Sequence, residues 1–216
     1  MLRIKMKEEV VRWAKELSAR NLTVGTGGNV SSFDRTEGLM VITPSGMEYA
    51  VLQADDMIVM KLNGDVVEGK WKPSSEWRLH AEVYKRRSDV NGVVHAHSTY
   101  ATAISCLQQE IPPLHYMIAL AGDNVPCAPY ATFGTQEIAS GACDVMANRR
   151  AVLLANHGIL TAAPTTAQAF HILEEIEQVA KLYCITRSMG NPVVISTDEM
   201  QKMNELFNQY GQKKNS

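Results

Sequence analysis

The stretch 93-VVHAHSTYATAIS-105 follows a pair of valines with two histidines that are one residue apart. Val93 and Val94 predict a buried strand, and the side chains of a strand alternate between its two faces. His95 and His97 therefore point to the same side, where two imidazoles suit one metal ion. An HxH pair alone also fits a solvated turn at a strand end, so the metal interpretation depends on a third ligand.

A third histidine follows the apolar run in 151-AVLLANHGIL-160. His157 comes directly before the turn-forming Gly158, so a second strand end delivers an imidazole. Three histidines form a typical catalytic zinc set, because such sites keep one position open for water or substrate. Nickel, cobalt or copper would accept the same donors, so zinc is favoured only by this pattern of use.

Composition limits the classes of protein to consider. The chain has 216 residues and a mass of 23.9 kDa, with 45% hydrophobic and 20% charged residues, which suits one domain over residues 1–216. A net charge of -2 gives no support for nucleic acid or an anionic membrane as a partner. The charged N-terminal stretch lacks the apolar run of a signal peptide, so we expect a cytoplasmic protein with a small-molecule ligand.

Periodicity predicts an α/β arrangement. Helices are expected at about 5–19, 75–87, 134–148, 165–188 and 197–209, and short strands at 39–43, at 57–62 and around the histidines. The turn 63-NGD-65 indicates a hairpin toward 66-VVEG-69. The four cysteines show no C-x-x-C spacing, which argues against a zinc ribbon and a disulfide framework.

The helix at 165–188 is expected to bury one stripe of residues. This stripe, with helical spacing, is a core face rather than a ligand site and consists of Phe170, Leu173, Ile176, Val179, Ala180 and Tyr183. His171 lies off that face and is expected in solvent. His80 stands four residues after Glu76 on an expected helix, so the two could form a metal pair, although the three strand-end histidines are the stronger set.

Three short segments are rich in the residues that bind anions. They are 25-GTGGNVSS-32, 43-TPSGM-47 and 72-KPSSEW-77, in which glycines let a ligand approach the backbone and small side chains donate hydrogen bonds. Each could be an ordinary turn, and none matches a Walker or G-x-G-x-x-G pattern. Ser74 and Ser75 stand near a predicted helix start, where the helix dipole favours a phosphate. Glu76 would then lie beside the anion and the metal, as a candidate acid/base. Lys72 is read as a solvated surface charge.

These motifs together resemble the class II aldolase/epimerase (aldolase class II, adducin-like) family over residues 8 to about 211. The resemblance rests on the order and spacing of "GTGGNVSS", "ITPSGM", "KPSSEWRLH", "VVHAHS", "IPPLHYMIALAG", "PCAPYATFGT" and "LLANHGIL". It implies a three-layer α/β/α sandwich with a mainly antiparallel central sheet. It also implies one zinc ion per subunit and a homotetramer with active sites at subunit interfaces.

The resemblance assigns roles to particular positions. His95, His97 and His157 would bind zinc, with Glu76 as a possible fourth ligand and the catalytic acid/base. Tyr116, from a neighbouring subunit, would handle the proton on the oxygen that becomes the aldehyde. The residues that would bind the substrate and its phosphate are Thr26, Gly28, Asn29, Ser45, Gly46, Ser74, Ser75, Phe133 and, in a mobile tail from about residue 208, Tyr210. Gly27 stands where the family pattern has Ala, which would widen the loop slightly.

The implied reaction is reversible retro-aldol cleavage of a ketose 1-phosphate, with L-fuculose 1-phosphate as the expected substrate and dihydroxyacetone phosphate and L-lactaldehyde as products. No Schiff-base lysine is needed. Alternatives within the family are another sugar-1-phosphate aldolase, a dehydratase, or an L-ribulose-5-phosphate 4-epimerase, in which Asp replaces the Glu of the P-S-S-E motif. A non-enzymatic alternative is an adducin-like scaffold, which lacks the metal histidines.

Overall fold

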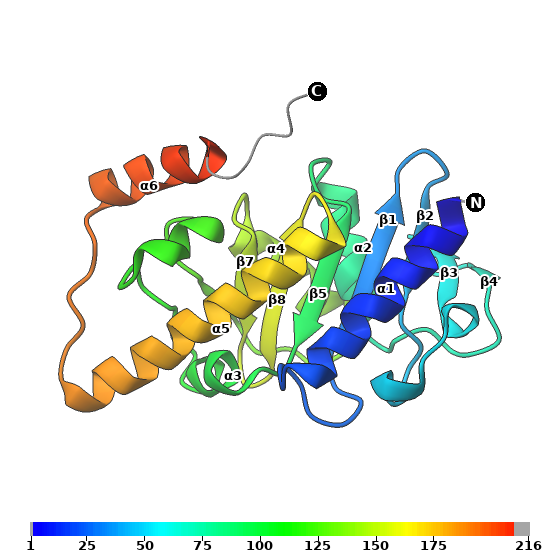
Figure 1. The fold of residues 1–216 in the computed structure, drawn as a ribbon, viewed down its shortest axis with the longest axis horizontal. Coiled ribbons are helices and arrows are strands. Elements are labelled where there is room, and N and C mark those ends of the chain that lie inside the picture. Colours follow the sequence, from blue (N-terminus) through cyan, green and yellow to red (C-terminus); the bar gives the residue numbers. More distant parts are fainter. Residues whose placement is uncertain (1, 210–216) are drawn as a thin grey trace.

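A computed structural model describes residues 2–209, in which one mixed sheet crosses the centre of the molecule (Figure 1). Its strands are, in chain order, β1 (Asn29–Asp34), β2 (Leu39–Ile42), β3 (Ile58–Lys61), β4 (Val66–Glu68), β5 (Gly92–Ala96), β6 (Cys127–Ala128), β7 (Ala151–Leu154) and β8 (Gly158–Ala163). In space the order is β4-β3-β2-β1-β5-β8-β7-β6. β6 pairs with β7 in parallel, and the other strand pairs are antiparallel.

Helices cover both faces of this sheet, which confirms the expected α/β/α sandwich. The first layer holds α1 (Leu2–Ala19), α3 (Thr99–Ser105) and α5 (Thr166–Met189), and the second holds α2 (Trp77–Arg86) and α4 (Gln136–Met146). Helix α6 (Thr197–Gln209) packs on the 3-10 helix η3 (Tyr116–Leu120), and two further 3-10 turns are η1 (Tyr49–Val51) and η2 (Ala54–Asp56). No helix within residues 2–209 is long and apolar enough to cross a membrane.

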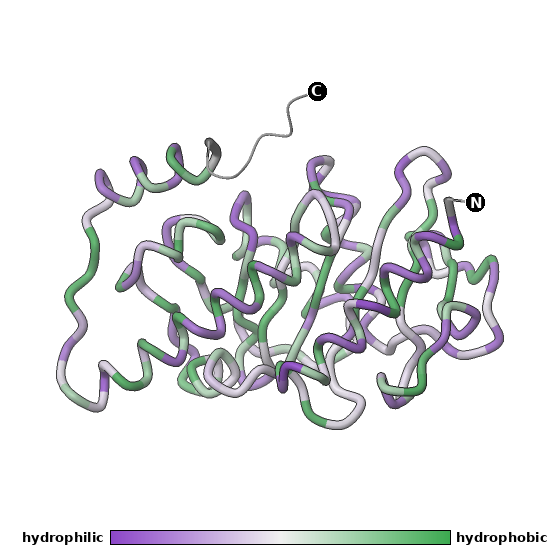
Figure 2. The backbone as a smooth tube through the Cα atoms, in the orientation of Figure 1, coloured by the Kyte–Doolittle hydropathy of each residue, from purple (hydrophilic) through white to green (hydrophobic). Residues whose placement is uncertain are grey.

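Amphipathic patterning explains why α1 and α5 lie on the sheet. Hydrophobic and hydrophilic residues alternate along both helices (Figure 2). The predicted stripe of α5 is buried at all six positions, which are Phe170, Leu173, Ile176, Val179, Ala180 and Tyr183. His171 is exposed, as predicted. Burying each large apolar side chain contributes about 1.5–3 kcal/mol, so this stripe suffices to fix the helix on the sheet.

The strand register around β5 determines which face of the sheet His95 and Asn29 occupy. Val94 and Ala96 pack into the layer of α1 and α5, whereas Val93 packs into the layer of α2 and α4. Because side chains alternate, His95 lies on the same face as Val93. Asn29 is the register partner of His95 across the β1–β5 pair, so the two residues lie side by side.

Some local predictions were wrong. Residues 29–32 were expected to belong to a glycine-rich loop, but they form the start of β1, because Val30 is buried in the core and the segment pairs with β2 and β5. Helix α2 begins at Trp77 rather than near residue 75. The short elements α3 and β6 were not predicted, since neither is long enough to show a clear period.

Candidate metal centre and adjoining pocket

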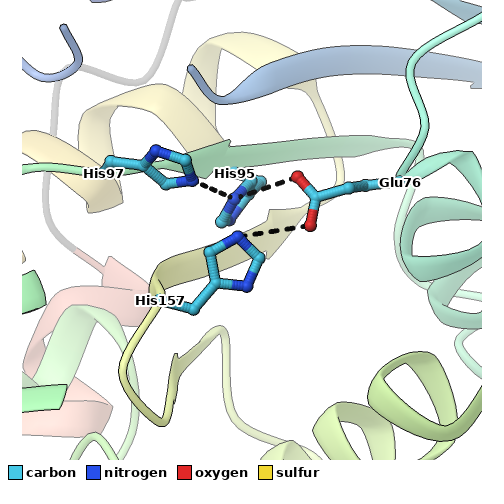
Figure 3. Close-up of side chains that lie close together, drawn as sticks. All are labelled: Glu76, His95, His97 and His157. Carbon is cyan, nitrogen blue, oxygen red and sulfur yellow. Dashed lines mark hydrogen bonds and ion pairs between the residues drawn. The ribbon is translucent and has the colours of Figure 1, made fainter. Parts of the chain in front are cut away.

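Three imidazoles and one carboxylate meet where β5 ends (Figure 3). His95 is the fourth residue of β5, His97 follows that strand, and His157 lies in the turn between β7 and β8. Glu76 reaches the same point from the residue before α2. One ligand atom from each of these four residues lies within 4.8 Å of all the others, so the group could hold one metal ion.

The hydrogen bonds of His95 favour a cation at this point. Its Nδ1 lies 2.9 Å from the carbonyl oxygen of Ile159, so Nδ1 carries the proton and donates it. The lone pair of its Nε2 then faces the Nε2 of His97 at 3.0 Å. Two lone pairs at this distance repel each other unless a cation or a proton lies between them.

Glu76 completes a donor set that fits a divalent ion. Its Oε2 lies 3.2 Å from His95 Nε2, and its Oε1 lies 3.3 Å from His157 Nε2. Oε1 is buried and has no hydrogen-bond partner among residues 2–209. A buried carboxylate oxygen without a partner is costly, and a metal bond would satisfy it.

The charges of these groups suit metal binding. Burial raises the pKa of Glu76, but its contacts with His95, His157 and Asn29 lower it, and the net direction is downward, so the group is a carboxylate. Burial lowers the pKa of His95, but Glu76 raises it, and the net direction is upward, so the carboxylate favours a positive charge at this point, which a proton or a metal ion would supply. Burial, followed by the effect of His95, lowers the pKa of His97 and of His157 to about 4. Both rings are therefore neutral near pH 7, the form in which imidazole binds a metal.

Backbone hydrogen bonds join the three segments that we predicted to bind an anion, residues 25–32, 43–47 and 72–77, to one another. The amide of Thr43 donates to the carbonyl of Val30 at 3.1 Å. The amides of Ser74 and Ser45 then donate to the carbonyls of Thr43 and Lys72, each at 3.0 Å. The two proline-serine loops are therefore fixed against each other and against the start of β1.

A pocket of about 400 Å³ opens between these segments and the metal centre. Most of the predicted substrate residues line it together with Glu76, His97 and His157, namely Thr26, Gly28, Asn29, Ser45, Gly46, Ser74, Ser75 and Phe133. The described lining contains no lysine or arginine. An anion in this pocket would thus be bound by hydroxyl, side-chain amide and backbone N–H groups.

The glycines of the pocket permit close contact with the histidine strand. A Cβ on Gly28, whose φ is +75°, would lie 2.6 Å from the carbonyl oxygen of His95. A Cβ on Gly27 would lie 2.8 Å from His97 Nδ1, so glycine at position 27 relieves a contact with a candidate ligand. We expected only a wider loop at this position.

Other candidate residues lie elsewhere. Tyr116 lines a separate groove beside α6 and is half-exposed. Tyr210 lies outside the described residues. His80 is not a ligand, because its two ring nitrogens contact Asn29 and Ser31. The amides of Glu76 and Trp77 donate hydrogen bonds to Ser74, so these two amides at the start of α2 are not free to bind a phosphate.

Two supporting residues were missed by the sequence analysis. Glu177 of α5 accepts hydrogen bonds from the Ser98 hydroxyl at 2.7 Å and from the amides of Tyr100 and Ala101 at 2.8 and 2.9 Å, which fixes the turn after His97. The Tyr49 hydroxyl donates to the carbonyls of Gly27 and Gly28. No sequence signal points to either residue, because each acts on a segment more than twenty positions away.

Comparison with known proteins identifies the family. Residues 8–184 match the family described as Class II Aldolase and Adducin N-terminal domain. The chain is 47% identical to a 5-deoxy-D-ribulose 1-phosphate aldolase of Bacillus thuringiensis serovar kurstaki, over 98% of this chain and 100% of the relative. It is 41% identical to an L-fuculose phosphate aldolase of Escherichia coli K12, over 98% of each chain.

A solved structure agrees with this assignment. A structure titled L-fuculose 1-phosphate aldolase superposes with a TM-score of 0.93 and 49% identity, covering 94% of this chain and 96% of that chain. The chain therefore belongs to the class II aldolase and adducin family. It is a class II aldolase by family and similarity, a metal-dependent class, and its Glu76 and three histidines could hold that metal.

Proposed function

We propose that this protein cleaves a ketose 1-phosphate reversibly into dihydroxyacetone phosphate and a short aldehyde. One observation carries the proposal: the metal centre of Glu76, His95, His97 and His157 adjoins a pocket lined by the three anion-binding segments. A substrate with its phosphate at Ser45, Gly46, Ser74 and Ser75 would direct its carbonyl end to the metal centre. Residues 1–216 would form one domain for this reaction.

The ion would be zinc, one per subunit, because a site of three histidines with one further ligand is a common catalytic zinc arrangement. When bound, it would supply Lewis-acid stabilisation of the negative charge that develops as the carbon–carbon bond breaks. His95, His97 and His157 would hold the ion, with Glu76 as a possible fourth ligand.

Two side chains would move the protons. In cleavage, the bond between C3 and C4 breaks, C3 gains a proton, and the C4 hydroxyl loses its proton as it becomes the aldehyde. Glu76, a carboxylate at rest, would first take up a proton from water in the pocket and would then deliver it to C3, since its carboxyl lies beside the three histidines and faces the pocket. Tyr116 of a neighbouring subunit would relay the C4 hydroxyl proton, because its oxygen would accept that proton as its own O–H proton passes to water, which balances the proton that Glu76 takes up. We assign Tyr116 to a neighbouring subunit because it lies outside the pocket of its own chain.

We propose two candidate substrates. L-Fuculose 1-phosphate would yield dihydroxyacetone phosphate and L-lactaldehyde, and the similarity to fuculose phosphate aldolases supports it. 5-Deoxyribulose 1-phosphate would yield dihydroxyacetone phosphate and acetaldehyde, and the 47% identical relative supports this second candidate. Both aldehydes end in a methyl group, which suits the apolar side of a pocket that includes Tyr130, Ala131 and Phe133.

The other members of the family make different products. An L-ribulose-5-phosphate 4-epimerase would invert one centre without releasing a three-carbon fragment, and a dehydratase would release water. A scaffold protein of the adducin type would need no metal histidines, whereas all three are assembled here. The assembled histidines therefore favour an enzyme over a scaffold, and the similarity to two aldolases, at 47% and 41% identity, supports aldol cleavage over the other two reactions.

We also propose a homotetramer with active sites at subunit interfaces, which would bring Tyr116 to the pocket of an adjacent chain. The half-exposed position of Tyr116 on its own chain supports this arrangement. A cytoplasmic location follows from the proposed substrate, because a phosphate ester carries charges that do not cross a membrane unaided.

Product identification tests the proposal. The zinc-loaded protein would be incubated with L-fuculose 1-phosphate, 5-deoxyribulose 1-phosphate and L-ribulose 5-phosphate, and the products identified by mass spectrometry. We expect a three-carbon phosphate and a methyl-ended aldehyde from one or both ketose 1-phosphates. Epimerised pentose phosphate, or loss of water alone, would instead assign one of the other reactions.

A further inference from the structure

A buried chain of polar side chains runs from Glu76 into the core between β1 and α2. Asn29 Nδ2 donates to Glu76 Oε2 at 3.0 Å, and Asn29 Oδ1 contacts His80 Nε2. The Ser31 hydroxyl oxygen lies 2.6 Å from His80 Nδ1 and 2.7 Å from the Tyr84 hydroxyl. None of these five side chains belongs to an exposed residue, and His80 and Ser31 are fully buried.

The Glu76 carboxylate and the neutral His80 ring fix the direction of the bonds in this chain. A carboxylate only accepts, so the Asn29 amide presents N–H to Glu76 and its oxygen to His80. The amide oxygen only accepts, so His80 Nε2 carries a proton. Burial lowers the pKa of His80 to about 3, so the ring is neutral and its Nδ1 accepts from the Ser31 hydroxyl. Tyr84 then donates to Ser31.

This arrangement holds the Asn29 amide in one of its two orientations. Asn29 lines the pocket, and among residues 2–209 the only partner of its Nδ2 is Glu76. The second N–H of that nitrogen is thus available to an anion in the pocket. A flipped amide would turn its oxygen toward both the Glu76 carboxylate and the anion, and both contacts would be repulsive.

We propose that His80 is a positioning residue that locks the Asn29 amide so that its two N–H groups serve Glu76 and the anionic end of the substrate. The inference rests on the proposed function only in naming the anion as a sugar phosphate. His80 is not among the candidate metal ligands, and its side chain is fully buried, so it would act only through Asn29.

The test compares His80→Leu with His80→Gln. Leucine removes the N–H donor, whereas the glutamine side chain restores both a donor for Asn29 and an acceptor for Ser31. The affinity of each zinc-loaded protein for dihydroxyacetone phosphate would be measured by calorimetry, together with zinc content, kcat and KM. We expect His80→Leu to weaken binding about 10- to 100-fold and to lower kcat, as loss of a supporting hydrogen bond at a metal site typically does. His80→Gln should recover most of the affinity.

The dissociation constant for dihydroxyacetone phosphate distinguishes a positioning role of His80 from a simple loss of protein stability. A protein that is only less stable loses active molecules, but the remaining molecules bind with unchanged affinity. Tyr84→Phe is the matched control, because it removes one buried hydroxyl from the same chain and leaves Ser31 bonded to His80. We expect its affinity to stay within about twofold of wild type.

Two results would overturn the inference. One is His80→Leu with full zinc and wild-type affinity, and the other is equal weakening in His80→Leu and His80→Gln. If His80→Leu does not fold, nitrogen-15 NMR of the wild-type histidines decides the matter: we expect His80 to carry its proton on Nε2, and a proton on Nδ1 contradicts the arrangement. Wild-type protein that neither binds nor releases dihydroxyacetone phosphate would count against the proposed function, separately from the variant comparison.

Discussion

His97 shows how strand geometry and burial give one histidine a role that another histidine of the chain does not share. Its Nε2 lies 3.0 Å from that of His95, and burial lowers its pKa to about 4, so it is a neutral imidazole at the candidate metal centre. His171 lies on the exposed face of α5. The two imidazoles are chemically identical, so the difference in their roles comes from where the fold places them.

Replacement of His97 by Ala should lower the metal content of the purified protein well below about one ion per chain, because a catalytic zinc site needs its protein ligands to compete with water. His171→Ala should retain wild-type metal content, as measured by elemental analysis after gel filtration. Equal metal content in the two variants would refute His97 as a ligand.

Glu76→Gln tests the acid/base role at the same scale. The amide has the size of the carboxyl but neither takes up nor releases a proton at neutral pH, so turnover should fall about 100- to 10,000-fold. The three histidines should still retain much of the metal. Near-wild-type turnover would show that Glu76 only neighbours the reaction.

At the scale of elements, the site depends on how closely β1 approaches β5. Gly28 precedes β1, has a φ of +75°, and lies so near β5 that a Cβ would be 2.6 Å from the carbonyl of His95. Gly25 has a similar φ of +64°, but nothing lies within 4 Å of its Cβ position. Substitution of Gly25 therefore tests the effect of a positive φ alone, whereas substitution of Gly28 tests a positive φ together with a steric clash.

Gly28→Ala should lower the free energy of unfolding by about 3 kcal/mol or more, since it adds a backbone clash to the strain of a positive φ. Gly25→Ala should cost only about 1–2 kcal/mol, the strain alone. Urea unfolding at one protein concentration would compare them. Equal losses would mean that the approach of the two strands tolerates a Cβ.

The same elements show what sequence patterns can predict. Long helices with a clear apolar stripe, such as α5, were predicted within a few residues, because burial of the stripe decides their position. The histidines were found because they follow apolar runs that read as strands. The start of β1 was missed, since glycines, Asn29 and serines resemble a loop until pairing with β2 and β5 is known. Glu177 was missed because its partners are distant in the chain.

At the scale of the whole molecule, we propose that each active site combines residues of two subunits, with Glu76 from one chain and Tyr116 from the other. Glu76→Gln and Tyr116→Phe should each impair activity. After the two variants are unfolded and reassembled together, some interfaces would combine an intact Glu76 with an intact Tyr116. The mixture should then regain activity that neither parent has. Tagged co-purification would verify the mixed oligomers, and mixed oligomers no more active than the mean of the parents would place both residues within one chain.

We propose that Glu76, His95, His97 and His157 bind a metal ion without which aldol cleavage does not proceed. The most direct measurement is the rate of dihydroxyacetone phosphate release from the preferred ketose 1-phosphate by protein as purified, after removal of metal by a chelator, and after zinc is restored. We expect release by the first sample, loss in the second and recovery in the third, with about one zinc per chain. Full activity in protein shown to be free of metal would contradict it.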